Sequence, residues 1–317
     1  MSDAIGVVMD PIGSIDVRKD STFAMLLAAQ RRGWAVWYME LGDLHYADGA
    51  VLARMRRLEV WDDRDPWYRF HEPRTTRVAA LPVVLMRKDP PFDMEYIYAT
   101  YLLELAAQDG TWVVNDPRTL RDANEKVFTT RFPHCVPPTR ITRYPEDIVD
   151  FLDAEGDIIL KPLGGMGGAS VFRVRREDPN LNVIIETLTD KGARYCMAQR
   201  FIPEISAGDK RILLIAGEPV PYLLARIPRP GETRGNLAVG ARAEGRPLAE
   251  RDRWIASQVG PELRRRGVLF AGLDVIGDYL TEINITSPTC IRELDAAFGL
   301  DIAGDLLAVI ERGLSDG

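Results

Sequence analysis

The sequence contains few of the residues that build metal-rich or disulfide-stabilised proteins. Among its 317 residues there are only three cysteines and three histidines. Cys135, Cys196 and Cys290 form no CxxC motif and cannot all pair, and the histidines are scattered, so we expect no disulfide framework and no zinc or haem site. The first ten residues, MSDAIGVVMD, lack the basic and long apolar regions of a signal peptide, which favours a reducing cytoplasm.

Long apolar runs and an excess of positive charge are also lacking. No window offers the roughly 18 uncharged apolar residues of a membrane-spanning helix. With 40 basic and 47 acidic residues the formal net charge is −7. This balance argues against nucleic acid or an anionic membrane as the main partner, because both bind clustered positive charge. An anionic ligand must therefore be bound by a local group of basic residues.

The first 122 residues alternate between strand and helix patterns. Short apolar runs predict strands, and longer stretches that open with capping residues predict helices. We expect strands at 5–9, 35–39, within 82–92 and at 111–115, helices at 20–33 and 94–110, and irregular or edge structure at 61–77. This alternation predicts a parallel sheet flanked by helices.

Two loops of this part follow predicted strands. DPIGSIDVRKDS (10–21) follows the first strand and RKDPPFD (87–93) a later one, and both contain Arg, Lys and Asp. Open α/β sheets bind ligands beyond the carboxyl ends of their strands, so the shared position favours a binding role. Either loop alone is equally compatible with ordinary solvated surface.

The rest of the chain is organised differently. We expect helices at 116–132, 144–156, 180–192 and from about 291, and strands within 158–174, at 194–202 and, antiparallel, within 211–227 and 269–286. The fold class is therefore α/β combined with α+β. We divide the chain into three domains, 1–122, 123–200 and 201–317.

IILKPLGGMGGASVFRV (158–174) places four glycines in five positions between two apolar runs. They are Gly164, Gly165, Gly167 and Gly168. The stretch lacks the Lys-Ser or Lys-Thr of a Walker A loop and the third glycine and following helix of a dinucleotide fingerprint. A hairpin turn needs one or two glycines, and each further glycine costs roughly 0.5–1 kcal/mol relative to alanine. The excess favours a mobile loop whose amides cover a phosphate, with a structural turn as the alternative.

LFAGLDVIGDYLTEINITSPT (269–289) predicts a β-hairpin with one polar face. Side chains alternate along a strand, so Glu282 and Asn284 point one way and the isoleucines beside them the other. A three-residue turn at 277–279 would bring Asp274 opposite Glu282, whereas a two-residue turn would split the polar group. Three oxygen ligands on adjacent strands suit Mg²⁺. The alternative is a solvated sheet face with ordinary acids.

Four basic residues are available to bind phosphate in this acidic protein. They are Lys126, Lys161, Arg211 and Arg226. Each charge-assisted hydrogen bond would contribute on the order of 1.5–3 kcal/mol. Taken singly, each residue also fits a surface charge.

Two further stretches can contact an anion. IPRPGETRGNLAVGAR (227–242) has no regular periodicity, as is typical of a lid whose Arg234 would reach a transferring phosphoryl group; a disordered surface loop is the alternative. TSPTCIREL (286–294) starts a helix at Ser287, whose free amides attract an anion or are simply capped.

Together these stretches resemble the ATP-grasp ligases and, within them, the bacterial glutathione synthetase family, over essentially the whole chain. The matching stretches include VVMDPI, KDSTFAML, LMRKDPPFD, NEK, ILKPLGGMGGASVFRV, GDKRILL, GETRGNLA and GLDVIGDYLTEINITSPTCIRE. Residues 45–80 are the least similar. The resemblance implies an ATP-grasp fold with an N-terminal Rossmann-like substrate domain, a small lid domain and a C-terminal catalytic domain.

The resemblance also implies an activity. The expected reaction joins γ-glutamylcysteine and glycine to glutathione, with ATP as co-substrate and an acyl phosphate as intermediate. Mg²⁺ is the expected metal, for which Mn²⁺ can substitute. We expect a cytoplasmic homotetramer or homodimer without a nucleic-acid or membrane partner.

Residue roles follow from the same resemblance. Lys126, Lys161, Gly164, Gly165, Gly167 and Gly168 would bind and cover the ATP phosphates. Gln199, Arg200, Phe201 and Ile202 would present a strand edge to adenine, and Asp209 would approach the ribose. Asp274, Glu282 and Asn284 would hold magnesium. The charge that moves during the reaction would be stabilised by Arg211, Arg226, Arg234 and Asn236, and Arg211 would also contact the nucleotide. The peptide would be held by Arg87 and Ser287.

Two other functions are compatible with these residues. Another ATP-grasp ligase, joining D-alanines or adding glutamate to a protein, would share the ATP and metal residues and differ in the loops 10–21 and 87–93. A regulatory module would bind ATP without turnover, but it leaves the metal and lid residues without a purpose.

Overall fold

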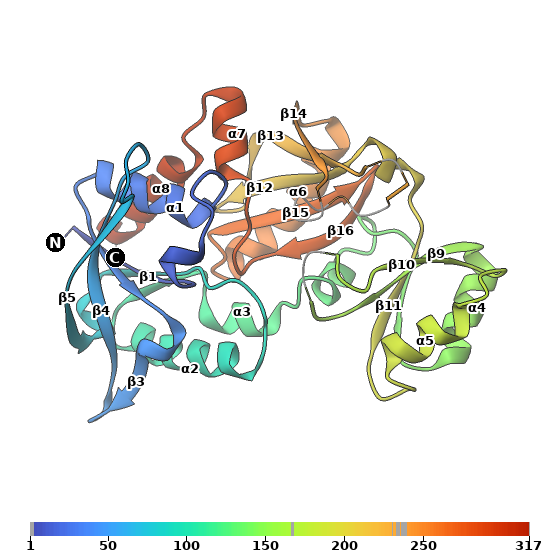
Figure 1. The fold of residues 1–317 in the computed structure, drawn as a ribbon, viewed down its shortest axis with the longest axis horizontal. Helices are drawn as coiled ribbons and strands as arrows, with labels where there is room; N and C mark the ends of the chain where they lie inside the picture. Colours follow the sequence, from blue (N-terminus) through green and yellow to red (C-terminus); the bar gives the residue numbers. More distant parts are fainter. Residues whose placement is uncertain (1–2, 166–167, 230, 233–234, 236–239, 317) are drawn as a thin grey trace.

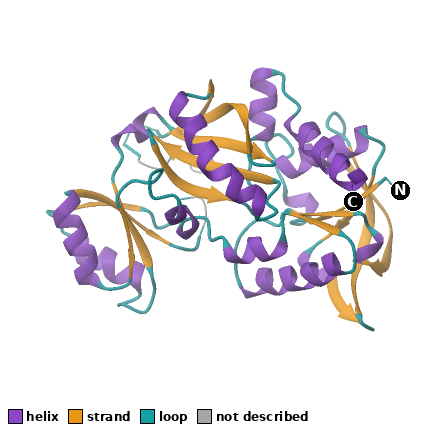
Figure 2. Cartoon of the chain, turned by 180° about the vertical axis from the view of Figure 1, so that it is seen from behind, coloured by secondary structure: helices purple, strands orange, loops and turns teal. Residues whose placement is uncertain are grey.

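The computed structural model describes residues 3–165, 168–229, 231–232, 235 and 240–316. The described chain contains three sheets, which lie in a row (Figure 1). The sheet of the N-terminal part is at one end, the small sheet formed by residues 139–200 is at the other, and the C-terminal sheet lies between them (Figures 1 and 2). The last sheet in sequence is thus the middle one in space.

The N-terminal sheet has the strand order β3-β4-β2-β1-β6-β7, with β5 paired to β4. Its strands are β1 (Ala4–Val8), β2 (Ala35–Met39), β3 (Leu44–Ala47), β4 (Ala50–Val60), β5 (Tyr68–Arg77), β6 (Val83–Met86) and β7 (Trp112–Val114). β1, β2, β6 and β7 are parallel, as predicted. β3 and β4 were not predicted, while β5 confirms edge structure within 61–77.

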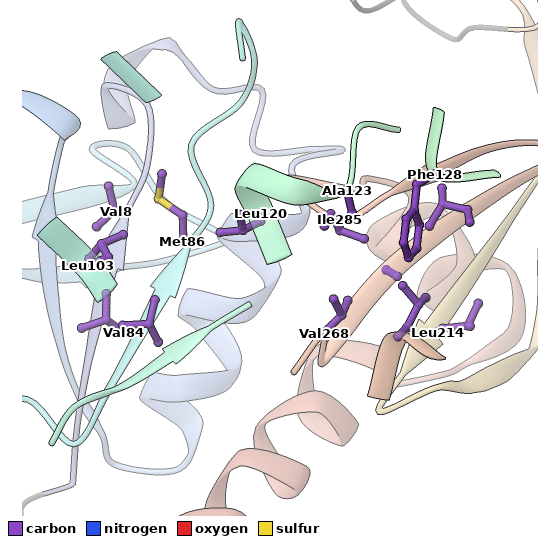
Figure 3. Close-up of a cluster of buried hydrophobic side chains, with 14 of the residues drawn as sticks. Val8, Val84, Met86, Leu103, Leu120, Ala123, Phe128, Leu214, Val268 and Ile285 are labelled. Carbon is purple, nitrogen blue, oxygen red and sulfur yellow. The ribbon is translucent and has the colours of Figure 1, made fainter. Parts of the chain in front are cut away.

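Two helices cover opposite faces of this sheet. α1 (Ser21–Arg31) begins at Asp20, whose carboxylate accepts a hydrogen bond from Phe23 N, and packs on the face that carries Val7. α2 (Met94–Gln108) packs on the face that carries Val8, Val84 and Met86 (Figure 3). The predicted loops after β1 and β6 therefore meet at the carboxyl ends of neighbouring parallel strands.

The small sheet has the order β10-β9-β11-β8 and its own hydrophobic core. Its elements are β8 (Thr139–Thr142), α4 (Pro145–Glu155), β9 (Asp157–Pro162), β10 (Phe172–Arg175), α5 (Leu181–Thr189) and β11 (Cys196–Arg200). α4 and α5 pack together on one face (Figure 1). β9 and β10 are antiparallel neighbours, so the predicted strand, glycine loop and returning strand are confirmed.

The C-terminal sheet is antiparallel, as predicted, with the order β14-β13-β12-β15-β16. Its elements are β12 (Asp209–Ile215), β13 (Glu218–Ile227), β14 (Arg242–Pro247), α6 (Glu250–Arg265), β15 (Phe270–Ile276), β16 (Tyr279–Asn284), α7 (Ile291–Phe298) and α8 (Ile302–Asp316). β14 and α6 were not predicted, and the closing helix is two helices. α8 packs against α1, and Arg31 pairs with Asp301 over 2.7 Å, so the end of the chain returns to the N-terminal sheet.

The long helix predicted at 116–132 is wrong. The structure has α3 (Pro117–Asp122), a break, and the short 3₁₀ helix η4 (Val127–Arg131). At the break the Asn124 side chain accepts hydrogen bonds from the amides of Lys126 and Val127, which competes with the helical pattern. The carbonyl of Glu125 is thereby free to accept a hydrogen bond from Ile283 N at 2.8 Å, which attaches the break to β16.

α6 approaches the turn between β12 and β13 unusually closely. Gly260 of α6 faces Gly217 of the turn, and a Cβ added at Gly260 would lie 2.0 Å from the carbonyl oxygen of Gly217. A Cβ added at Gly217 would lie 2.6 Å from the carbonyl oxygen of Gly260. Only glycine fits at either position without moving the helix.

Within the described residues, none of the helices combines the length and the apolar composition needed to cross a membrane.

Candidate active site

A cavity of about 250 Å³ collects most of the predicted site residues. Those that line it are Lys126, Lys161, Gly165, Gly168, Gln199, Arg200, Phe201, Ile202, Asp209, Arg211, Arg226, Asp274, Glu282, Asn284 and Ser287. Gly164 and Arg87 do not line it. Gly167, Arg234 and Asn236 lie outside the described residues.

The hairpin of β15 and β16 pairs the predicted metal residues in the expected register, but its turn differs from the expected one. Asp274 lies opposite Glu282, as predicted. The turn has two residues, not three, because Ile276 pairs with Tyr279. A β-bulge at Thr281 absorbs the extra residue and restores the register.

The bulge itself contributes to the site. The Thr281 hydroxyl donates a hydrogen bond to the carbonyl of Asp274 at 3.0 Å. The Thr281 carbonyl accepts one from the ammonium of Lys161, 3.4 Å away. The prediction of a shared polar face therefore holds, although a two-residue turn alone would have split it.

Asp274 is buried between two arginines. Its carboxylate accepts a hydrogen bond from Arg211 Nε at 2.6 Å and forms an ion pair with Arg226 Nη2 at 3.0 Å. Asn284 Nδ2 lies 3.3 Å from the same carboxylate. Burial alone would raise the pKa of Asp274, but the two guanidinium groups hold it below its usual range. The aspartate is therefore ionised, and it orients both arginines.

Lys126, Lys161 and Glu282 form a second charged group. The Lys126 and Lys161 ammonium groups lie 3.7 and 3.9 Å from Glu282 Oε1. Burial lowers the pKa of Lys161. Burial acts in the same direction on Lys126, but Glu282 and Glu125 outweigh it and raise the pKa of that lysine.

Glu125 is a cavity residue that the sequence analysis missed. Its carboxylate accepts a hydrogen bond from the Lys126 ammonium. Burial, and then the negative charge of Glu282, raise its pKa. Its place in the NEK motif, beside a lysine already singled out, was the available indication.

Asp209 and Arg226 make a buried ion pair on β12 and β13, with 2.6 Å between Oδ2 and Nη2. Burial raises the pKa of Asp209 to about 6 against the opposing effect of Arg226. The second oxygen, Oδ1, is buried without a hydrogen-bond partner in the described part of the chain. Gly235 packs on this pair so closely that an added Cβ would lie 2.6 Å from Asp209 Cβ and 2.8 Å from the Arg226 carbonyl oxygen.

The predicted strand edge at 199–202 needs a correction. β11 lies between β8 and β9, so through Gln199 both of its edges are paired. Only the residues after Arg200 leave the sheet, and there Phe201 N still donates to the Asp157 carbonyl at 2.9 Å. The Gln199 side chain is buried and donates to Thr139 Oγ1 at 3.0 Å.

Arg87 is buried beside the cavity. Its guanidinium donates to the carbonyl of Pro288 and the hydroxyl of Thr22, each at 3.1 Å, and lies 3.5 Å from the carbonyl of Thr286. It thus holds the backbone on either side of Ser287, which does line the cavity. Its geometry fits a positioning residue for this loop better than direct contact with a substrate.

The glycine loop lies next to the lysines. The Lys126 ammonium donates to the Gly165 carbonyl at 3.2 Å. Gly165 and Gly168 have φ of 98° and 74°, which favour glycine. A Cβ added at Gly164 or Gly165 would meet no atom of a described residue within 4 Å.

The donor set fits a hard divalent cation. Asp274, Glu282 and Asn284 offer carboxylate and amide oxygens on one face of the hairpin. Among the described residues, no group of three or more His, Cys, Asp and Glu side chains is arranged to hold a metal ion. A metal ion bound here would therefore also need the oxygen of Asn284 and oxygens of a bound phosphate. Magnesium is commonly bound in this way, by few protein groups together with a substrate phosphate.

Two family models match the chain. Residues 4–121 match the N-terminal domain of prokaryotic glutathione synthetase, and residues 125–299 match its ATP-grasp domain.

Relatives and solved structures agree with these matches. The chain is 60 % identical over 314 residues to the glutathione synthetase of Pseudomonas putida, covering 99 % of each. It is 59 % identical over 310 residues to that of Vibrio cholerae serotype O1, covering 98 % of each. The crystal structure of the D-cycloserine synthetase DcsG aligns with a TM-score of 0.68 at 14 % identity, covering 98 % of this chain and 99 % of that one, which supports the ATP-grasp fold.

Proposed function

The chain belongs to the prokaryotic glutathione synthetase family, and we propose that it joins γ-glutamylcysteine to glycine, with hydrolysis of ATP to ADP and phosphate, as an ATP-dependent ligase. The observation that carries this proposal is the single cavity shared by two lysines, two arginines and an oxygen-rich hairpin face. A reaction between two anions, a carboxylate and a triphosphate, requires this combination.

One end of the cavity suits a nucleotide. Ile202 and Ile205 are buried apolar residues that line it, next to Phe201. In our proposal the base lies against these residues, beyond the paired part of β11. Lys126 and Lys161 then face the phosphates, and the glycine loop closes over them with its amides.

The metal is a divalent cation in our proposal, as the family implies, and Mg²⁺ is the specific ion, with Mn²⁺ as a substitute. Asp274, Glu282 and Asn284 would hold it. When bound, the ion supplies positive charge that neutralises the β- and γ-phosphates. Binding would draw Glu282 toward the ion and leave the ammonium groups of Lys126 and Lys161 for phosphate oxygens.

The chemistry proceeds in two steps. The cysteinyl carboxylate attacks the γ-phosphorus, ADP leaves, and an acyl phosphate forms. The amine of glycine then attacks the acyl carbon, phosphate leaves, and the proton of the amine passes to phosphate. Arg211 and Arg226, oriented by Asp274, would bind the oxygens that carry the moving charge.

The acyl phosphate must be protected from water. The segment 227–242 would act as the lid, with Arg234 and Asn236 reaching the transferred group. Gly235 packs on Asp209 and Arg226, which supports a closing role for this segment. In the same proposal the domains are 1–122, 123–200 and 201–317, and the protein works as a cytoplasmic homotetramer or homodimer.

The test is a substrate-omission experiment. The purified protein is incubated with Mg-ATP, γ-glutamylcysteine and glycine, each is omitted in turn, and ADP and the thiol product are measured, the latter by mass. We expect ADP release to require both substrates and to yield glutathione. Turnover only with another carboxylate and amine would show that the protein is an ATP-grasp ligase with different substrates. ATP binding without any turnover would favour a regulatory module.

A further inference from the structure

We propose that Asp89 binds the ammonium group at the γ-glutamyl end of the peptide substrate and so selects γ-glutamyl peptides from other carboxylates. This inference rests on the proposed function. Asp89 lies in the loop after β6, for which the sequence predicts a binding role without singling out this residue, and it lines the cavity.

The backbone of Asp89 is held on both sides. Its N–H donates to Asp10 Oδ2 at 2.8 Å, and its carbonyl accepts from the Lys88 ammonium at 2.5 Å. Lys88 in turn pairs with Asp10 Oδ1 at 2.8 Å. Asp10 follows β1, so the ends of two parallel strands jointly fix this residue. A position fixed in this way presents its side chain with little freedom.

The side chain of Asp89, in contrast, has no hydrogen bond or ion pair with any described residue. The two basic residues that precede it in the chain are already engaged. Lys88 is neutralised by Asp10, and Arg87 donates to Thr22 Oγ1 and to carbonyl oxygens of the loop at 286–288. The partly buried carboxylate at the cavity wall therefore receives no hydrogen bond from a described cation, although the charge of the buried Arg87 acts on it and is shared with Asp20.

The carboxylate of Asp20 is a second negative charge near Asp89, and it favours binding of a cation there. Burial raises the pKa of Asp20, and the charge of Asp89 adds to that effect while Arg87 opposes it. One buried guanidinium thus faces two carboxylates, which leaves the surroundings of Asp89 net negative. An incoming ammonium group would balance them, whereas a carboxylate would be repelled.

Asp89 shares one cavity with the oxygen-rich face of the hairpin. Asn284 of that face, the loop residues 286–289 and Asp89 with Pro90 all line it. A γ-glutamylcysteine whose cysteinyl carboxylate lies at the metal face extends roughly 10 Å, about three residues of extended chain. Its far end carries the only ammonium group of the molecule, and in our proposal that end lies at Asp89.

The experiment compares two substrates in two proteins. γ-Glutamylcysteine and glutarylcysteine, which lacks only the ammonium group, are assayed with the wild-type enzyme and with Asp89→Asn. We expect the wild-type enzyme to use the glutaryl compound about 100-fold less efficiently by kcat/KM, because an ion-paired carboxylate is left unpaired. In Asp89→Asn the two substrates should differ less than about fivefold, while KM for ATP stays within about twofold. Asp153→Asn, an exposed residue of α4 that does not line the cavity, is the charge-matched control.

The outcomes separate this inference from the proposed function. If the wild-type enzyme does not turn over γ-glutamylcysteine, the proposed function fails. If it does, but accepts the glutaryl compound equally well, Asp89 has no ammonium to bind and the inference is wrong; this arm needs no variant to fold. Equal discrimination in wild type and Asp89→Asn would also overturn it.

Discussion

The Lys210 ammonium donates a hydrogen bond to the carbonyl oxygen of Gly277 at 2.7 Å, and so attaches the centre of the C-terminal sheet to the turn between β15 and β16. The same ammonium pairs with Asp252 at the start of α6. Asp252 is 1 % exposed and also accepts a hydrogen bond from Ala249 N at 3.0 Å. One lysine therefore connects a strand, a helix start and a turn on the side of the sheet away from the cavity.

Replacing Lys210 should destabilise the fold. Lys210→Met leaves the buried Asp252 carboxylate without its cation, which we expect to cost about 3–5 kcal/mol of unfolding free energy. Urea unfolding measures this loss. Lys210→Met combined with Asp252→Asn should recover part of it, because the asparagine still caps α6 without an unpaired charge. A single variant as stable as the wild type would show that the pair is not important for stability.

Removing the carboxylate charge of Glu282 should stop turnover without unfolding the protein. In Glu282→Gln the cation loses an anionic ligand and the two lysines lose their shared partner, so we expect kcat to fall on the order of 100-fold or more. Steady-state kinetics with Mg-ATP and thermal unfolding measure the two effects. Asp278→Asn, an exposed turn residue of the same hairpin, is the control and should remain active. Near wild-type activity in Glu282→Gln would rule out the metal assignment.

The buried Asp209 should make stability depend on pH. Its pKa rises from 3.8 to about 6 on folding, so the folded state binds this proton more tightly than the unfolded state. The contribution is fully present below pH 3.8 and is lost as the pH rises through about 6, in total about 3 kcal/mol. Asp209→Asn removes the titration, so its stability relative to the wild type should increase between pH 4.5 and 7.5. The free energy of unfolding of both proteins is measured in urea at several pH values. A constant difference between the two proteins over this pH range would contradict the prediction.

A methyl group at Gly235 should interfere with the lid. The added carbon would meet the Arg226 carbonyl oxygen at 2.8 Å, and that oxygen belongs to β13, whose ladder resists displacement. We expect Gly235→Ala to lower kcat about tenfold or more and to increase ATP hydrolysis relative to ligation. Measuring ADP and glutathione in the same reaction gives the coupling ratio. Gly42→Ala, where an added Cβ meets no atom of the described chain within 4 Å, should leave the ratio unchanged; unchanged coupling in Gly235→Ala would count against the lid.

The pattern of apolar and polar residues predicted the parallel strands and the polar face of the hairpin, and the spacing of the glycines predicted the loop. They succeeded because these features depend on residues close in sequence. The face of Asp274 and Glu282 was predicted correctly with the wrong turn, because eight residue steps separate the two positions whether the extra residue lies in the turn or in a bulge. A sequence pattern cannot distinguish these cases, since both bury the same isoleucines.

The failures depend on contacts between distant segments. The helix expected over 116–132 is interrupted at Asn124, where a local side-chain cap and a backbone bond to β16 replace helical bonds. The family resemblance implies that Arg87 holds the peptide, and the structure adds that its guanidinium is engaged by carbonyl groups about 200 residues later in the chain. The free edge expected for β11 is covered by β8, a pairing across more than 50 residues. None of these partners is visible from local sequence.

The facing glycines Gly217 and Gly260 restrict how this sequence can diverge. A methyl group at either position meets the backbone of the other, so no substitution at one can be compensated by a substitution at its partner. Only a shift of α6 as a whole would make room, and that shift would move Asp252 away from Lys210. Each position therefore restricts the other to glycine, and Gly260→Ala offers a route to a temperature-sensitive protein whose defect originates far from any substrate.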